Sequence, residues 1–190
     1  MALKLSFYGG AGKVTGSNFL VSGEKGRILV DCGIEQGIDF CEECVYGAFP
    51  YNVKNIDALI VTHAHLDHVG RIPKLVKEGF RKKIFMTPPT RDLMALILHD
   101  SIGILGEDAK RRGTVPLYEK QDVDAPLSLV ETLAYRTEKE VAPGLSLHFT
   151  LSCRLKKRVS PLFVDCRHFN GKRGVQENWY LLKLSCRKEV

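Results

Sequence analysis

The sequence contains no run of about twenty apolar residues, the length that a membrane-spanning helix requires. Its opening, residues 1–8, enters a strand pattern directly and lacks the layout of a secretory signal peptide. Hydrophobic residues make up 44% and charged residues 26%, as is ordinary for a globular protein. We therefore expect a cytoplasmic protein with no membrane partner, built as one domain or as one domain with an appendage.

Cysteine is too scarce and too scattered, at six residues, for the disulfide framework of a small secreted domain. Cys41 and Cys44 form a C-x-x-C pair, which is a weak signal for a metal or redox site. A structural zinc would need a second such pair, and Cys153, Cys166 and Cys186 are isolated. We expect Cys41 and Cys44 to be ordinary reduced thiols near a loop.

Positive charge is concentrated at one end of the chain. Residues 151–190 carry 10 Lys and Arg against 3 Asp and Glu, whereas residues 1–150 carry 18 against 19. The net charge of +6 therefore comes from the last forty residues. A basic tail of this kind can bind phosphate backbones, or it can simply be a solvated terminus, and both readings stay open.

Short apolar runs alternate with stretches of helical spacing, which indicates an α/β layered domain. Residues 34–52 and 110–113 are expected to be irregular. The apolar group within residues 176–186 could form a strand. The expected strands are 3–8, 18–21, 27–30, 56–61, 83–86 and 145–151. The expected helices are 72–78, about 91–105 with Thr90 or Asp92 as its cap, and 119–133, interrupted by Pro126.

Three histidines and an aspartate lie within six positions directly after the buried strand expected at 56–61: His63, His65, Asp67 and His68. Imidazole and carboxylate are ligands that suit zinc and similar divalent metals. In extended backbone His63 and His65 point the same way, onto one metal. The turn that follows directs Asp67 and His68 to a second position. This spacing predicts a dinuclear metal site.

Residues 62–73, THAHLDHVGRIP, resemble the metal-binding signature of the metallo-β-lactamase superfamily. They are most similar to its branch of β-CASP nucleases, which includes ribonuclease J and the cleavage-and-polyadenylation endonuclease. Three further stretches resemble that branch: GGAGKVTGS at 9–17, LVDCG at 29–33 followed by Gln36-Gly37, and TPPTRDL at 87–93 followed by Asp100-Ser101. The resemblance covers roughly residues 1–150 and implies the N-terminal half of an αββα sandwich.

The resemblance also implies roles for single residues. His63 and His65 would hold the first of two divalent metal ions, with zinc the expected element. Asp67 and His68 would hold the second ion, and Asp67 would also orient the attacking water. Asp31 would be a supporting residue that forms hydrogen bonds near the site without binding metal. Without the family, Asp31 reads as a turn residue at a strand end.

Other residues with chemical potential are expected to be structural. The loop around Lys13 does not have the spacing of a phosphate-binding P-loop, and the resemblance explains its glycines as a tight turn. His99 lies beside the apolar stripe of an expected helix. His148 lies on an expected strand, where we predict that it faces the surface.

The chain departs from the family after residue 150. A third histidine for the first metal is expected there, and the nearest candidate is His168 in DCRHFNG, about a dozen residues late. The family's bridging aspartate, its inserted β-CASP domain and its final histidines have no counterpart. We expect a domain at 1–150, the N-terminal half of the fold, and a divergent basic tail at 151–190 that is truncated or frameshifted.

Three functions are compatible with the sequence. The first is hydrolysis of RNA by a metal-activated water, with RNA as the partner. The second keeps the metal site but acts on a small thioester or lactone. The third is a catalytically inactive fragment or partner subunit. The sequence also leaves a homo-oligomer open.

Overall fold

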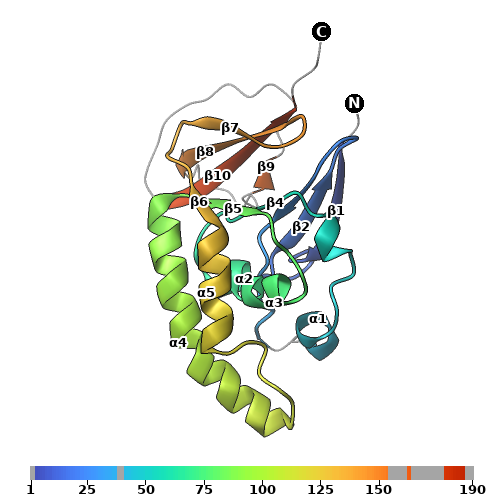
Figure 1. The fold of residues 1–190 in the computed structure, drawn as a ribbon, viewed down its shortest axis with the longest axis vertical. Coiled ribbons are helices and arrows are strands. Elements are labelled where there is room, and N and C mark those ends of the chain that lie inside the picture. The colour runs from blue at the N-terminus through green and yellow to red at the C-terminus, as the bar shows by residue number, and fades with distance from the viewer. Residues whose placement is uncertain (1–2, 38–40, 154–161, 164–177, 187–190) are drawn as a thin grey trace.

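The computed structural model describes residues 3–37, 41–153, 162–163 and 178–186. They form two sheets and a layer of helices, as the predicted α/β sandwich requires (Figure 1). None of the helices in these ranges is both long and apolar enough to cross a membrane.

The first sheet has six strands in the order β1-β2-β3-β4-β5-β6. Its first three strands are antiparallel neighbours, and β3 to β6 run parallel. The carboxyl ends of β3, β4 and β5 therefore lie at one edge of the sheet, which is where polar groups collect in α/β proteins. The strands are β1 (Lys4–Gly9), β2 (Asn18–Ser22), β3 (Arg27–Val30), β4 (Ala58–Ile60), β5 (Lys83–Met86) and β6 (Val130–Thr132).

Helices cover one face of this sheet, and the second sheet lies on the other side (Figure 1). The longest helix, α4, ends at Gly113, whose left-handed backbone (φ 67°) suits glycine. The helices are α1 (Glu42–Tyr46), the 3-10 turn η1 (Val53–Asn55), α2 (Leu66–Val69), α3 (Ile72–Lys77), α4 (Pro88–Arg112) and α5 (Lys120–Leu129).

The second sheet has the order β7-β8-β10-β9. Its longest pairing joins β8 and β10 in antiparallel register, from Asn178 opposite Cys153 to Cys186 opposite Leu145. The strand suggested within 176–186 is thus confirmed, and β8 runs past residue 150. The proposed division at residue 150 stays a prediction. The strands are β7 (Glu138–Ala142), β8 (Leu145–Cys153), β9 (Leu162–Phe163) and β10 (Asn178–Cys186).

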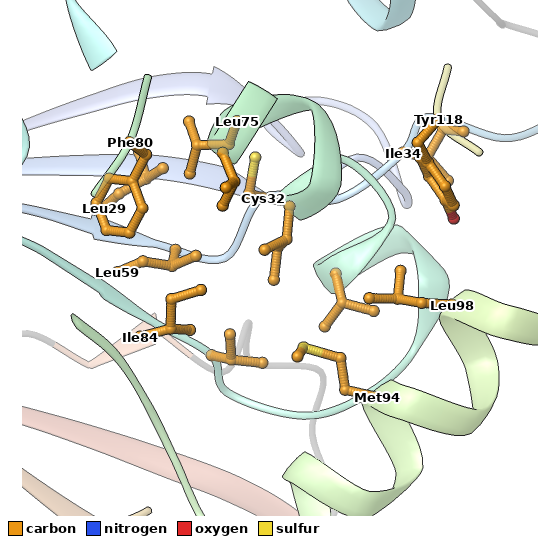
Figure 2. Close-up of a cluster of buried hydrophobic side chains, with 14 of the residues drawn as sticks. Leu29, Cys32, Ile34, Leu59, Leu75, Phe80, Ile84, Met94, Leu98 and Tyr118 are labelled. Carbon is orange, nitrogen blue, oxygen red and sulfur yellow. The ribbon is translucent and has the colours of Figure 1, made fainter. Parts of the chain in front are cut away.

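Strand alternation divides the core into two clusters. Leu29, Leu59 and Ile84 are fully buried in the helix-side cluster, where they lie near Met94 and Leu98 of α4 (Figure 2). Residues one position away on the same strands, among them Ile28, Ile60 and Phe85, belong to the cluster that includes residues of β7 and β8. A strand buried on both faces reads as a continuous apolar run, which is why the strands of this sheet were predictable.

Several expected boundaries were wrong. The long helix begins at Pro88 with Thr87 as its cap residue, three positions before the expected start, because proline fits the first helical turn. It continues through residues 110–112, which were expected to be irregular. The expected loop 34–52 contains α1. Pro126 lies inside α5, and the chain leaves the helix four residues later to form β6.

Candidate metal centre

The histidine cluster lies at the carboxyl ends of two parallel strands. Asp31 directly follows β3, and His63 lies three residues after the end of β4. His65 is the N-terminal cap residue of α2, and Asp67 and His68 lie within that helix. The fold therefore brings five of the six residues that the sequence predicted for this site to one edge of the first sheet.

Asp31 is the hydrogen-bonding hub of the cluster. Its buried carboxylate accepts hydrogen bonds from the backbone N–H of Thr62 (2.8 Å) and from its hydroxyl (2.8 Å to Oδ2). It also lies 2.7 Å from Nδ1 of His68 and accepts a bond of 3.3 Å from Ser17. Its backbone is left-handed (φ 57°), a conformation that aspartate tolerates better than most residues. Its predicted supporting role in metal binding stays a prediction.

These bonds determine which ring nitrogens carry protons. A carboxylate only accepts, so Nδ1 of His68 must donate to Asp31. The Thr62 hydroxyl gives its proton to Asp31 and is left to accept from Nδ1 of His63, 3.0 Å away. In the neutral rings, Nε2 of both histidines is therefore unprotonated and carries the lone pair of the ring.

The donor atoms of the cluster form two close pairs. Nε2 of His63 lies 3.2 Å from Nδ1 of His65, and Nε2 of His68 lies 3.5 Å from Oδ2 of Asp67. Two imidazole nitrogens in one pair, and a nitrogen and a carboxylate oxygen in the other, are donors that suit divalent zinc. The residues present therefore fit a metal site, and their roles as ligands stay a prediction.

Burial and charge have opposite effects on two of the rings. Burial, with a contribution from neighbouring His68, lowers the pKa of His63 to about 4. For His68 burial also lowers the pKa, but the charge and hydrogen bond of Asp31 outweigh it and raise the pKa overall. At neutral pH His63 is thus uncharged and able to donate its lone pair to a cation.

Close backbone packing fixes α2 against the loop that follows β3. A Cβ atom on Gly33 would lie 1.6 Å from the carbonyl oxygen of Asp67, so only glycine fits there. Ser17 N–H donates to that same oxygen (2.8 Å), and Cys32 N–H donates to the carbonyl of His68 (2.8 Å). The orientation of α2 thus depends on the backbone of two distant segments.

Sequence reasoning gave no role to Thr62, Ser17 and Arg71. Thr62 and Ser17 contact Asp31, and Arg71 donates from Nε to the carbonyl of Gly33 (2.8 Å). All three stand inside the motifs that carried the family resemblance. Their presence there was the signal that could have identified them.

The remaining candidates lie away from the cluster. Lys13 forms an ion pair with Glu35, and its loop is a tight turn in which a Cβ on Gly9 would meet the Gly16 carbonyl at 2.0 Å. His99 lies on α4, 4.0 Å from Asp124.

Two expectations were wrong. His148 does not face the surface, since its Nε2 is buried and has no hydrogen-bond partner among the described residues.

The second wrong expectation concerns the C-x-x-C pair, because Cys41 and Cys44 are joined by a disulfide. The candidate ligand His168 lies outside the described residues. Of the four predicted ligands that are described, no three bring donor atoms within 4.8 Å of one another. A pocket of about 340 Å³ between α3 and α5, lined by Pro73, Lys77 and Asp122 among others, contains none of them.

Two sheets lie in layers, and the first presents a histidine and aspartate cluster at its strand ends. This arrangement is typical of a class of metal-dependent hydrolases. Comparison with known families agrees, because the model of the metallo-beta-lactamase superfamily matches residues 11–121. The chain belongs to the metallo-beta-lactamase superfamily. This confirms the predicted fold class, and membership of this family supports binding of divalent metal.

Curated relatives refine the comparison. The chain is 38% identical over 148 residues to the transcription termination factor FttA of Methanosarcina mazei, covering 77% of this chain and 23% of that protein. It is 38% identical over 128 residues to ribonuclease TTHA0252 of Thermus thermophilus, covering 67% and 27%. It is 32% identical over 146 residues to an RNase J-like protein of Methanocaldococcus jannaschii, covering 76% and 30%.

These relatives confirm the predicted resemblance to the N-terminal part of RNA-processing nucleases. The chain spans between 23% and 30% of their lengths. The activities of these longer proteins are therefore only proposed for this chain.

Proposed function

We propose that the chain is a metal-dependent hydrolase that cleaves phosphodiester bonds of RNA. The observation that carries the proposal is the set of hydrogen bonds around Asp31, which leaves Nε2 of His63 and of His68 unprotonated. Each of these atoms lies beside a second donor, on His65 or on Asp67. Such donor sets are typical of hydrolytic zinc sites.

In this proposal two divalent cations, with zinc the expected element, would be held by His63 with His65 and by Asp67 with His68. When bound, they supply a water of lowered pKa and offset negative charge on the attacking and leaving oxygens. The Asp67 carboxylate holds the attacking water and accepts its proton. Asp31 keeps the His68 ring in place by accepting from Nδ1.

The choice of RNA rests on three curated relatives, two of them named as ribonucleases and one as a transcription termination factor. The basic character of residues 151–190 supports it, because Lys and Arg bind a phosphate backbone irrespective of its sequence. A cytoplasmic location and a homo-oligomer stay predictions.

One observation favours a second candidate, an inactive partner subunit. The four described donors form two pairs and no group of three within 4.8 Å. Catalytic zinc sites usually have three protein ligands, so each pair would need a further ligand from elsewhere. His168 is the candidate from this chain.

The deciding experiment measures bound zinc per chain and cleavage of an end-labelled single-stranded RNA by the purified full chain. With the Cys41–Cys44 disulfide intact, we expect close to two zinc ions per chain and cleavage that a chelator stops. His63→Ala/His65→Ala should lose zinc and activity, and Asp67→Asn should lose most activity.

His99→Ala is the matched control, because it removes an imidazole from an exposed position on α4 and should change neither readout. Two zinc ions with hydrolysis of a thioester or lactone but not of RNA would contradict the RNA proposal. One zinc ion or none, with no cleavage, would support the inactive subunit.

A further inference from the structure

A second cluster of metal-ligating side chains lies outside the histidine site. One carboxylate oxygen of Glu35 and the sulfur atoms of Cys41 and Cys44 all lie within 4.8 Å of one another. Among the described residues, this is the group of three metal-ligating side chains whose ligand atoms lie within that distance of one another. They share no residue with the histidine cluster, and the proposed function gives them no role.

The fold, and not the C-x-x-C spacing alone, creates this cluster. Glu35 is buried in the loop that follows β3, where Lys13 forms an ion pair with it. Cys41 is the cap residue of α1, and its sulfur accepts a hydrogen bond from the backbone N–H of Cys44 (3.2 Å). An N–H donated to sulfur favours the thiolate form once the cysteines are reduced.

Two buried cations position α1 beside Glu35. Arg71 donates to the carbonyl of Cys44, and Nζ of Lys74 donates to the carbonyl of Gly47 (2.8 Å). Both side chains also lie over the ring of Phe49, at 5.0 and 4.6 Å from its centroid. The two hydrogen bonds end on backbone carbonyls, of Cys44 in α1 and of its cap residue Gly47, so they do not depend on whether the two sulfurs are bonded.

We propose that Glu35, Cys41 and Cys44 form a second metal site, which binds one zinc-class divalent cation when the cysteines are reduced. A dithiol reductant transfers two electrons and two protons to the disulfide, leaves two thiols and is itself oxidised to a disulfide. The cation then displaces the two thiol protons to solvent and binds two thiolates and one carboxylate. A water molecule can take the fourth position.

Charge and ligand type define the metal class. Two thiolates and a carboxylate carry three negative charges, which a divalent cation and the Lys13 ammonium balance. Thiolate ligands select zinc, cobalt and similar ions over magnesium and calcium, which prefer oxygen ligands. The disulfide and the metal exclude each other, so occupancy of the site depends on the redox state of the pair.

Cobalt(II) tests the site, because a cobalt–thiolate bond gives a charge-transfer absorption band that imidazole and carboxylate ligands do not give. The full chain is reduced, freed of reductant without oxygen and titrated with cobalt. We expect one equivalent to produce the band, and the oxidised chain to produce none. His63→Ala/His65→Ala should keep the band, which separates this site from the histidine cluster and from the proposed hydrolase function.

Two variants identify the ligands. Cys41→Ser/Cys44→Ser should abolish the band, whereas the fully buried Cys32 is retained in every variant as an internal control. Glu35→Gln should keep the two thiolates and weaken cobalt binding about tenfold or more. Unchanged circular dichroism confirms that each variant is folded. Absence of a band in the reduced, folded chain, a band that survives in the double serine variant, or unchanged affinity in Glu35→Gln would each overturn the proposal.

Discussion

Asp31 organises the hydrogen bonds of the histidine cluster. It accepts from Thr62, His68 and Ser17 at once, and these bonds fix the rotamer of one histidine and the tautomers of two. Because the proton on Nδ1 leaves Nε2 unprotonated, the position of one buried carboxylate determines which ring nitrogens carry lone pairs.

Asp31→Asn should weaken both folding and metal binding. An amide presents N–H groups to donors that need an acceptor, so at least one buried hydrogen bond is lost. We expect a loss of about 2 kcal/mol in the free energy of unfolding and about 10- to 100-fold in zinc affinity. Chemical denaturation and zinc titration measure the two effects. Asp57→Asn, which alters a half-buried carboxylate that accepts from the backbone N–H of Arg27, should change zinc affinity little.

Tyr118 should make stability depend on alkaline pH. Its side chain is fully buried with its hydroxyl 2.7 Å from Ser101, and burial raises its pKa to about 12. An unfolded tyrosine loses its proton near pH 10, so the unfolded state is favoured increasingly from pH 10 to pH 12. The stabilisation is complete below pH 10 and falls by about 1.4 kcal/mol per pH unit in that window.

Tyr118→Phe should remove this slope. At pH 8 we expect the variant to be about 1 kcal/mol less stable, because one buried hydrogen bond is lost. Above pH 11 the variant should be the more stable protein. Denaturant unfolding at a series of pH values measures the free energy of unfolding of both proteins below pH 10 and above it. Parallel curves for the two proteins across pH 10–12 would contradict the raised pKa of Tyr118.

At the scale of elements, close approach of α2 to the loop after β3 is the feature that holds Asp67 and His68. The Cβ position of Gly33 overlaps backbone atoms of both residues. Gly33→Ala must therefore shift α2, and we expect a destabilisation of more than about 2 kcal/mol together with loss of zinc binding. Thermal unfolding and zinc content measure the two effects.

Gly103 provides a matched control in α4, where an added Cβ meets nothing within 4 Å. Alanine has the higher helix propensity, so Gly103→Ala should stabilise the chain by about 0.5–1 kcal/mol. The same chemical change should thus have opposite signs at the two positions. Equal effects would show that the α2 contact does not constrain the site.

The elements differ in how far their sequence predicts them. The apolar runs of β3, β4 and β5 were predictable because both faces are buried. The ends of α4 were not, since a proline start and a basic last turn before Gly113 resemble irregular chain. The histidine cluster was predictable because its residues are close in sequence. The cluster of Glu35 with Cys41 and Cys44 was not, because Arg71 and Lys74 bring α1 into place from a distant helix.

At the scale of the whole molecule, charge is distributed unevenly relative to the fold. The proposed catalytic residues belong to a nearly neutral segment, and the net positive charge comes from residues 151–190. If RNA is the substrate, this segment supplies sequence-independent affinity through its Lys and Arg side chains, and binding must weaken as salt concentration rises. A small neutral substrate would bind with no such dependence.

Neutralising part of this segment gives the last prediction. For Lys156→Gln/Lys157→Gln/Arg158→Gln we expect the plot of log affinity against log salt to become less steep by about 2, at about 0.7 per lost contact with single-stranded RNA. Lys110→Gln/Arg111→Gln/Arg112→Gln removes the same charge at the end of α4, where Arg111 and Arg112 already pair with Asp108. This control should leave the slope unchanged. Equal slopes in all three proteins would mean that the basic segment does not bind RNA.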